Sequence, residues 1–316
     1  MKTTTWMVAV IAGATVALVA PVTHAAAPTT AENAAAQPAF ATPQEGAKAL
    51  VDAARTGNSA NIAKLMGKNP GWLSSGDKVA DAAERQRFLD AYDRKNSIRM
   101  EGDSKAVIEA GDGDWSFPAP LVKRGDRWVF DAEAGREEVL NRRVGRNELD
   151  TVQTLLAIVD AQREYAASDP DRNGINDYAT KFRSSPGKKD GLYWPTKPGE
   201  PQSPLGPLVA QAVKEGYAGA AKSGPAAYHG YYYRLLTAQG KAAPGGAFNY
   251  VVNGRLFGGF AVVAWPASYG NSGVKSFLVN HDGIVYEKDL GPKTLEAFRA
   301  MDRFNPDASW SPVLED

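Results

Sequence analysis

The chain has 316 residues, 36 basic and 36 acidic side chains, and a hydrophobic content of 43%. This length is enough for about two domains with a sizeable core. The balanced charge gives no indication of nucleic acid as a partner, because proteins that bind nucleic acid usually carry a basic surplus. The absence of cysteine excludes Cys-dependent catalysis, thiolate metal sites and Cys-ligated iron–sulfur clusters.

The N-terminus has the pattern of a secretory signal peptide. Lys2 precedes an apolar run over residues 7–20, and Thr23 with Ala25 gives the small-residue cleavage pattern. The apolar run has 14 residues, whereas a membrane span needs ~20. An uncleaved membrane anchor is therefore the weaker alternative. We predict a signal peptide over residues 1–25 and a periplasmic or secreted protein.

The rest of the chain predicts a linker and two subdomains of an α+β fold. Residues 26–43 are rich in Ala, Pro and Thr and lack apolar periodicity, which indicates a disordered linker. Residues 44–146 carry three helical patterns followed by four strand patterns. We expect helices packed on an antiparallel sheet, with Trp115, Trp128 and Phe130 buried. This layout is similar to that of cystatins and NTF2-like proteins.

A long amphipathic helix opens the second subdomain, residues 147–316. Apolar residues recur at helical spacing over about 147–167, and Asn147 with Asp150 matches a capping box at the start. Strand patterns follow at 228–239, 248–266, 274–280 and 284–290, and a closing helix opens near Pro292. These patterns predict a second antiparallel sheet.

Several stretches of the second half resemble a known bacterial family. They include "YHGYYYRLLTAQG" and "NYVVNGRLFGGFAVVAWPASYGNSGVKSFLVNHDGIVYEKDLGPKT". On these stretches the chain is similar, over about residues 44–316, to the family called domain of unknown function 2950. The resemblance implies an exported protein and no activity that can be transferred.

A second likeness concerns the long helix, the loop after it and the second sheet. A helix with "AIVDAQREYA", a polar loop and an antiparallel sheet are similar to the globular part of type II secretion pseudopilins. Here a whole domain precedes the helix, and there is no prepilin cleavage site. Pilus assembly therefore does not follow from this likeness.

The stretch "DPDRNGINDY", residues 169–178, has the spacing of a calcium-binding loop. In an EF-hand-like count, the predicted ligands are Asp169, Asp171, Asn173, the Ile175 carbonyl and Asp177, at positions 1, 3, 5, 7 and 9. Thr180 replaces the usual Glu at position 12, so we expect a weak site, on the order of 10⁻⁴–10⁻³ M. The alternative is a polar turn in which Asp and Asn side chains bond their own backbone.

The sequence carries no complete catalytic motif. The two histidines of the mature chain, His229 and His281, form no H-x-x-x-H or H-E-x-x-H, so no zinc hydrolase is predicted. "YGNSGV" does not match the G-x-S-x-G nucleophile elbow. S-x-x-K occurs at Ser75, Ser185 and Ser272, but the S-D-N and K-T-G of penicillin-binding enzymes are missing.

Binding of a ligand remains open. The stretch "YHGYYY", residues 228–233, is expected to form a sheet face, with a ligand surface as the alternative. Arg142, Arg143 and Arg146 are expected on a solvated helix face, with anion binding as the alternative. We therefore predict a non-enzymatic binding or structural module of the cell envelope, whose partner is an envelope protein or polymer. The alternative is a hydrolase acting on an envelope polymer, which needs a deep pocket with polar groups of perturbed pKa.

Overall fold

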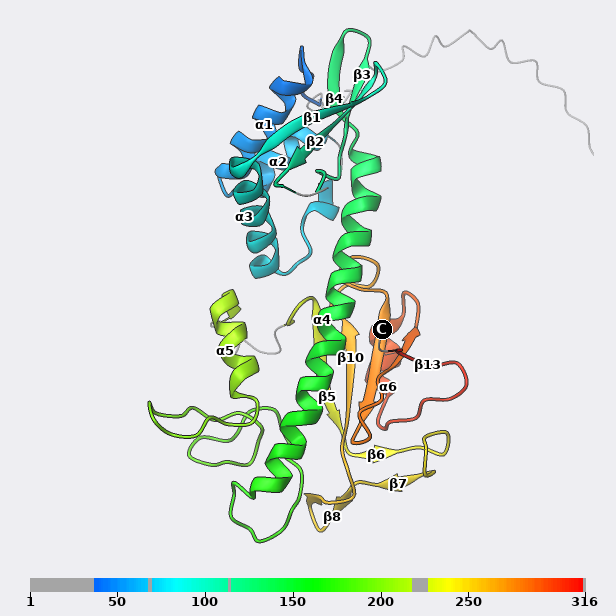
Figure 1. The fold of residues 1–316 in the computed structure, drawn as a ribbon. Helices are drawn as coiled ribbons and strands as arrows, with labels where there is room; N and C mark the ends of the chain where they lie inside the picture. Colours follow the sequence, from blue (N-terminus) through cyan, green and yellow to red (C-terminus); the bar gives the residue numbers. More distant parts are fainter. Residues whose placement is uncertain (1–36, 68–69, 113–114, 218–226, 315–316) are drawn as a thin grey trace, which may run out of the picture. The chain divides into compact units, whose positions relative to one another are not determined.

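The computed structural model describes residues 37–67, 70–112, 115–217 and 227–314 (Figure 1). The predicted signal peptide and the linker up to residue 36 lie outside the described residues. Residues 36–316 form one compact unit, to which all elements below belong. None of the helices within the described ranges combines the length and the apolar content that crossing a bilayer requires.

The first sheet is a four-stranded antiparallel meander with helices packed on it. Its strands are β1 (Asn96–Glu101), β2 (Lys105–Ala110), β3 (Leu121–Arg124) and β4 (Arg127–Phe130). The elements before it are α1 (Pro43–Arg55), α2 (Ser59–Met66), the short 3₁₀ helix η1 (Pro70–Leu73) and α3 (Lys78–Arg94). Trp128 and Phe130 are buried, as predicted, whereas Trp115 is only half-buried against this core.

The described end of the predicted linker packs onto this sheet. Gln37 donates hydrogen bonds to two main-chain carbonyls, including that of Phe130 at 2.8 Å. Phe40 exchanges two backbone hydrogen bonds of 2.8 Å with Trp128. Disorder was therefore wrongly predicted for residues 37–43. Ordering this stretch costs conformational entropy. These hydrogen bonds, together with the edge-on packing of the Phe40 ring against Phe130, offset that cost.

The long helix α4 (Ala132–Ser168) is continuous over 37 residues and begins well before the predicted start. Asp131 is its N-cap and accepts a hydrogen bond from the Ala134 N–H. Asn147 is buried inside the helix, so the predicted capping box is wrong. The first turns lack an apolar stripe because their stabilising contacts are polar. They include the ion pairs Arg136–Glu133 and Arg142–Glu138, spaced i,i+3 and i,i+4.

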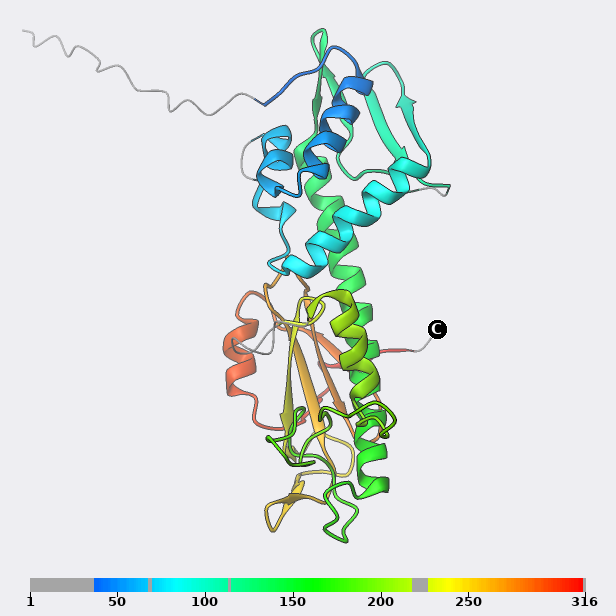
Figure 2. The same ribbon diagram turned by 90° about the vertical axis from the view of Figure 1, so that its left-hand side faces the viewer.

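The second sheet has the strand order β13-β12-β11-β10-β5, with all neighbours antiparallel. The strands are β5 (Tyr231–Leu236), β10 (Ala261–Pro266), β11 (Lys275–Asn280), β12 (Tyr286–Asp289) and β13 (Ser311–Pro312). Helix α4 lies on one face and α6 (Thr294–Ala300) on the other (Figure 2). The central strands β10 and β11 are therefore buried at nearly every position.

Smaller elements complete the second half of the chain. They are α5 (Gly206–Glu215) and two short ribbons, β6 (Ala238–Gln239) with β7 (Phe248–Asn249), and β8 (Val251–Val252) with β9 (Arg255–Leu256). Pro292 stands ahead of α6 rather than in its first turn.

The fold is α+β, as predicted, with helices and antiparallel sheets. Buried apolar side chains form two clusters, one within residues 47–130 and one within 155–310. The predicted border at residue 146 falls inside α4, which continues through it. The division into two subdomains and the cystatin- or NTF2-like layout stay predictions.

Replacing Asn147 by Ala should lower the stability of the protein. The buried Asn147 side chain donates a 2.8 Å hydrogen bond to the Ser272 carbonyl. Its loss leaves that carbonyl without this donor, which costs about 1–3 kcal/mol. The midpoint of urea unfolding, followed by circular dichroism, measures the effect. Asn141→Ala on the exposed face of the same helix is the control, and equal midpoints for both variants would contradict the expectation.

Candidate functional site

The predicted calcium loop follows the end of α4 and bonds to its own backbone. Asp169 has a left-handed backbone with φ of 41°. Its carboxylate accepts hydrogen bonds from the N–H groups of Asn173 at 3.0 Å and Gly174 at 2.9 Å, and the bond from Gly174 lowers its pKa. The Ile175 carbonyl accepts from the Asp177 N–H at 2.9 Å. The side-chain oxygen of Asn173 accepts from the Ile175 N–H at 2.7 Å, so three of the predicted ligands are engaged in the turn itself.

The other predicted ligands meet around the amide of Asn173. Its Nδ2 lies 2.7 and 2.8 Å from the two carboxylate oxygens of Asp171 and 3.0 Å from Asp177 Oδ1. Arg255 of β9 adds a cation, with Nη1 3.2 Å from Asp177 Oδ2 and 3.9 Å from Asp171 Oδ2. The carboxylate oxygens of Asp171 and Asp177 therefore converge on one point, and the protein's own donors, the Asn173 amide and the Arg255 guanidinium, occupy it.

These residues fit a calcium ion only after a rearrangement. Within the described part of the chain, no group of three or more His, Cys, Asp or Glu side chains is placed to hold a metal. Asp171 and Asp177 offer hard oxygen ligands, and turning the Asn173 amide over would add a third. Asp169, Asn173 and the Ile175 carbonyl would first have to give up their backbone partners. The calcium site therefore stays a prediction, and the polar turn stays its alternative.

A cavity of about 520 Å³ lies between α1, α2, η1, α3, the β2–β3 connection and α4. Four aromatic rings line it: Trp72, Phe88, Trp115 and Phe117. Its polar side is formed by charged residues of α3 and α4. The sequence analysis missed this cavity because its walls come from separated segments of the chain, although the three arginines of α4 were a usable signal.

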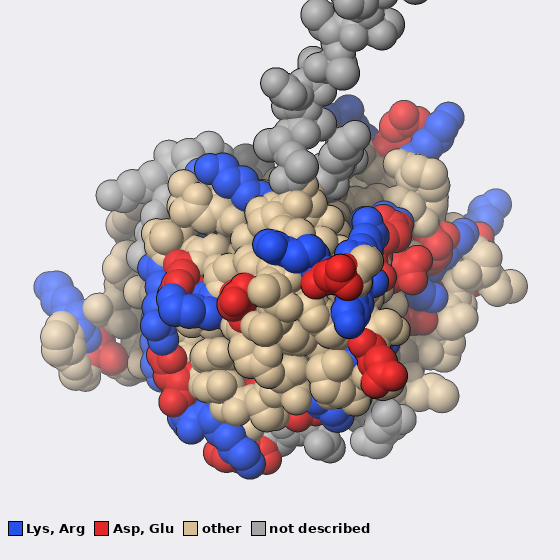
Figure 3. Space-filling model, turned by 90° about the horizontal axis from the view of Figure 1, so that it is seen from above, with Lys and Arg blue, Asp and Glu red and all other residues tan. Residues whose placement is uncertain are grey.

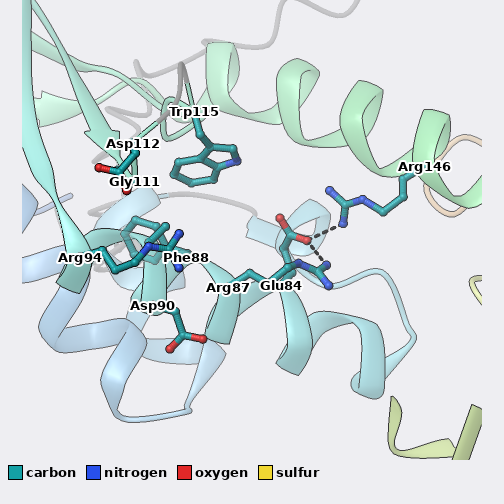
Figure 4. Close-up of a pocket in the computed structure, with 11 residues that line it drawn as sticks. Glu84, Arg87, Phe88, Asp90, Arg94, Gly111, Asp112, Trp115 and Arg146 are labelled. Carbon is teal, nitrogen blue, oxygen red and sulfur yellow. Dashed lines mark hydrogen bonds and ion pairs between the residues drawn. The ribbon is translucent and has the colours of Figure 1, made fainter. Parts of the chain in front are cut away.

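A second cavity of about 660 Å³ meets the first at Glu84, Phe88, Trp115 and Arg146 (Figure 4). Figure 4 shows Arg146 reaching from α4 to the Glu84 carboxylate of α3, which Arg87 also contacts. Burial raises the pKa of Glu84, but the hydrogen bonds from Arg87 and Arg146 outweigh it and hold that pKa below its usual value. The carboxyl is therefore ionised at neutral pH.

Arg143 does not belong to a solvated helix face. The side chain is half-buried and donates hydrogen bonds to the Trp72 carbonyl at 2.9 Å and to the Asn271 side chain. Burial lowers the pKa of its guanidinium. The expectation was wrong for Arg143 because the helix extends further back than predicted, so that this turn packs against η1 and a loop of the second sheet.

The two histidines lie apart from the cavity, whereas Ser75 and Lys78 of one S-x-x-K match line it, with the Ser75 hydroxyl bonded to the Asp77 backbone. The His229 ring nitrogens are 3.3 Å from Asp150 Oδ2 and 3.2 Å from Glu215 Oε2. His281 follows β11, and neither histidine lines either cavity. Among the residues that the structure describes, no hydrogen bond joins a histidine to a serine.

Ser185 contacts a different lysine from the one in its S-x-x-K match. Its hydroxyl lies 2.8 Å from the Nζ of Lys181, and not of Lys188, and 3.0 Å from Asp190. Burial raises the pKa of Asp190, but hydrogen bonds from Lys181 and Ser185 hold it at about 2. Lys181 also forms a 2.9 Å ion pair with this ionised carboxylate.

Residues 231–233 of the tyrosine-rich stretch belong to β5, as expected, while residues 228–230 form the turn before it. Tyr231 is fully buried and donates to the Lys275 carbonyl at 2.8 Å. Tyr232 packs beside Trp265 of the neighbouring strand. The rings of Tyr231 and Tyr232 therefore take part in the packing of the sheet.

Comparison with known proteins gives one match. A sequence model of the family described as "Protein of unknown function (DUF2950)" covers residues 37–313. No curated protein and no solved structure matches the chain. The family resemblance is thereby confirmed, while the likeness to pseudopilins stays a prediction.

Calcium should raise the melting temperature if the loop binds it. Binding to the folded state alone stabilises by about 1.4 kcal/mol at tenfold excess over Kd, or a few degrees in millimolar calcium. Magnesium should act much less, because it demands a tighter octahedron. Differential scanning calorimetry and titration calorimetry measure both effects.

Three variants make the calcium test specific. Asp171→Ala should remove most of the shift, and Asp160→Ala, an exposed acid on α4, should keep it. Arg255→Met should raise the calcium affinity, since it removes the competing cation. If no binding heat appears at millimolar calcium, or if Asp171→Ala keeps the full shift, the loop is a polar turn.

Proposed function

Since the chain belongs to the DUF2950 family, whose description assigns no activity, we propose a function from the geometry of its cavity. The protein is a non-enzymatic binding module of the cell envelope that holds a small ligand in the 520 Å³ cavity. The observation that carries this proposal is a concave site that joins four aromatic rings to several guanidinium groups.

The size and lining of the cavity support binding of a small molecule. Ligand sites usually measure ~300–1,000 Å³ and combine apolar walls with a few polar groups that fix orientation. Trp72, Phe88, Trp115 and Phe117 provide the apolar area. Phe88 is buried and packs against Trp115 and Phe117, with ring centroids 5.7 and 5.5 Å apart. The rings thus support one another before a ligand arrives.

The same residues favour binding over hydrolysis. A hydrolase acting on an envelope polymer needs a general acid or base with a pKa near the working pH. Glu84 instead has a lowered pKa and is paired with two arginines. Such a carboxylate stores no proton at neutral pH. The cavity therefore has charges that recognise a ligand, and Glu84, the carboxylate that it shares with the second cavity, is not poised for proton transfer at neutral pH.

A calcium-braced loop is a second proposed function. Its support is the convergence of Asp171 and Asp177 on the Asn173 amide, directly after the helix that also lines the cavity. An ion there would neutralise two carboxylates and restrict the freedom of the loop. This role is structural and is independent of the ligand in the cavity.

Filling the cavity should abolish ligand binding. Val139 of α4 lines it and is half-buried, so Val139→Trp places a large ring inside. We expect 2-naphthalenemethanol, a neutral aromatic probe, to bind the wild-type protein and to bind this variant at least about tenfold more weakly, since an occupied cavity can bury little of the probe. Titration calorimetry measures both affinities.

The control for this variant is Asn141→Trp, which adds the same ring on the exposed face of α4. It should bind the probe as the wild type does. Unfolding midpoints of both variants show whether either has lost its fold. Equal probe binding by folded Val139→Trp and Asn141→Trp would place the probe elsewhere.

Export should remove the first 25 residues. The proposal rests on Lys2, the apolar run and the Thr23/Ala25 pair. Mass spectrometry of the protein from its native host should find a chain that starts at Ala26 or within a residue or two of it. Intact Met1 in a cytoplasmic fraction would end the claim of export.

A further inference from the structure

We infer that the ligand of the 520 Å³ cavity is an amphipathic organic anion, with an apolar body and a carboxylate, sulfonate or phosphate head. This inference rests on the proposed binding function and narrows it to one chemical class. It follows from the charges of the lining, from how those charges are already paired, and from where the aromatic rings lie.

The lining of the cavity is cationic although the chain is neutral. The formal net charge of the whole protein is zero, and the face in Figure 3 mixes blue and red side chains around an uncharged area. The cavity is lined by five cationic residues, Lys78, Arg85, Arg142, Arg143 and Arg146, and by two anionic residues, Asp81 and Glu84. A concentration of one sign in a concave, partly apolar site focuses the field on a ligand of the opposite sign.

The two acids of the lining are already engaged. Asp81 accepts hydrogen bonds from the Ser75 N–H at 3.0 and 3.1 Å and from the Ser74 hydroxyl at 2.9 Å. Glu84 is shared by Arg146 and by Arg87. Neither carboxylate forms an ion pair with Arg143 within the described residues. The lining keeps a net positive charge because it has five cations and two anions, although Asp81 and Glu84 still act on Arg143 from a distance.

Arg143 shows this surplus most clearly. Its described hydrogen-bond acceptors are the carbonyls of Trp72 and Leu73 and the Asn271 side chain, all of them neutral. A half-buried guanidinium without a carboxylate partner is unfavourable, because burial costs it hydration that neutral acceptors only partly replace. An anionic head group in the cavity would supply a counter-charge in direct contact, whereas Asp81 and Glu84 act on Arg143 only from a distance.

Arg142 and Arg146 can hold the head group together. They are spaced i,i+4 on α4, which puts their side chains on the same face of the helix. Arg142 donates to Glu138 and to the Ser116 carbonyl, and Arg146 donates to Glu84. Each guanidinium has five N–H donors, so each keeps donors for a ligand oxygen.

The position of the aromatic rings indicates where the apolar end of the ligand binds. Arg142 lies over the Trp115 ring, 5.8 Å from its centroid, and Trp115 lies beside Phe88 in Figure 4. An apolar body that starts at the arginines therefore meets Trp115, Phe88 and Phe117 directly. A bare inorganic anion would leave this apolar surface uncovered, which is why the ligand is amphipathic.

Matched probes test the inference on the intact mature chain. Titration calorimetry compares 2-naphthoate with 2-naphthalenemethanol and 2-naphthylmethylammonium, and octanoate with octanol and octylammonium; acetate and inorganic phosphate test the head group alone. We expect each organic acid to bind at least about tenfold more tightly than its alcohol, as charge-assisted hydrogen bonds are roughly twice as strong as neutral ones. The ammonium probes and the bare anions should bind weakest, and the preference should shrink at high salt.

Variants test whether the lining arginines cause the preference for the acid over the alcohol. Arg146→Gln should reduce the acid-to-alcohol preference several-fold and leave the affinity for the alcohol unchanged. Arg136→Gln, an exposed arginine on the same helix that pairs with Glu133, should change neither. If Arg146→Gln fails to fold, Arg142→Gln serves in its place. Val139→Trp should weaken binding of acid and alcohol alike.

The outcomes separate this inference from the proposed function. In one outcome, acid and alcohol bind with equal affinity while Val139→Trp blocks both. This result would overturn the inference that the ligand is an anion, but the proposed binding function would still hold. Equal loss of acid and alcohol in Arg146→Gln would also overturn the inference, since the residue would then act only on the shape of the cavity. Acetate or phosphate binding as tightly as the organic acids would overturn the amphipathic part. No binding of any probe would contradict both the inference and the binding function.

Discussion

The buried polar side of α4 is the constraint on which the rest of the structure depends. In its middle turns, Arg143, Asn147 and Glu148 hold the loop at residues 271–275. Asn147 donates to the Ser272 carbonyl, and Glu148 accepts from the N–H groups of Val274 and Lys275, all within 2.9 Å. Buried polar groups of this kind are costly when unpaired. The loop therefore has one register on the helix, and this register also positions the sheet that it belongs to.

The same helix supplies the candidate ligand site. Arg143 reaches the η1 carbonyls from the turn that also binds Asn271, so the wall of the cavity and the loop of the second sheet share one guanidinium. Asn271 in turn donates to the Ser74 carbonyl beside the cavity. A ligand that draws on Arg143 consequently acts on a residue that contacts both halves of the chain, although the ligand's own contacts stay in the first.

Local patterns in the sequence were sufficient for most helices and strands, and insufficient where long-range contacts decide. Apolar periodicity found α1, whose buried residues repeat at helical spacing, and continuous apolar runs found β10 and β11, which are buried at nearly every position. Asn147 looked like a helix cap because Asn favours that position, yet its partner, Ser272, is 125 residues away. The cavity was missed for the same reason, since no local pattern brings Trp72 and Arg143 together.

The continuity of α4 limits how the chain can vary in length. Each residue added to a helix lengthens it by 1.5 Å and rotates the residues beyond the insertion by about 100°. A single insertion between Glu148 and Leu155 would thus rotate one apolar cluster relative to the other and move the 271–275 loop away from its three partners on α4. The exposed loop around residue 197 lies outside this helix and bonds locally, from the Lys197 N–H to Glu200. Evolution can therefore lengthen the protein at its loops, while the span of α4 between the clusters is held to a fixed number of residues.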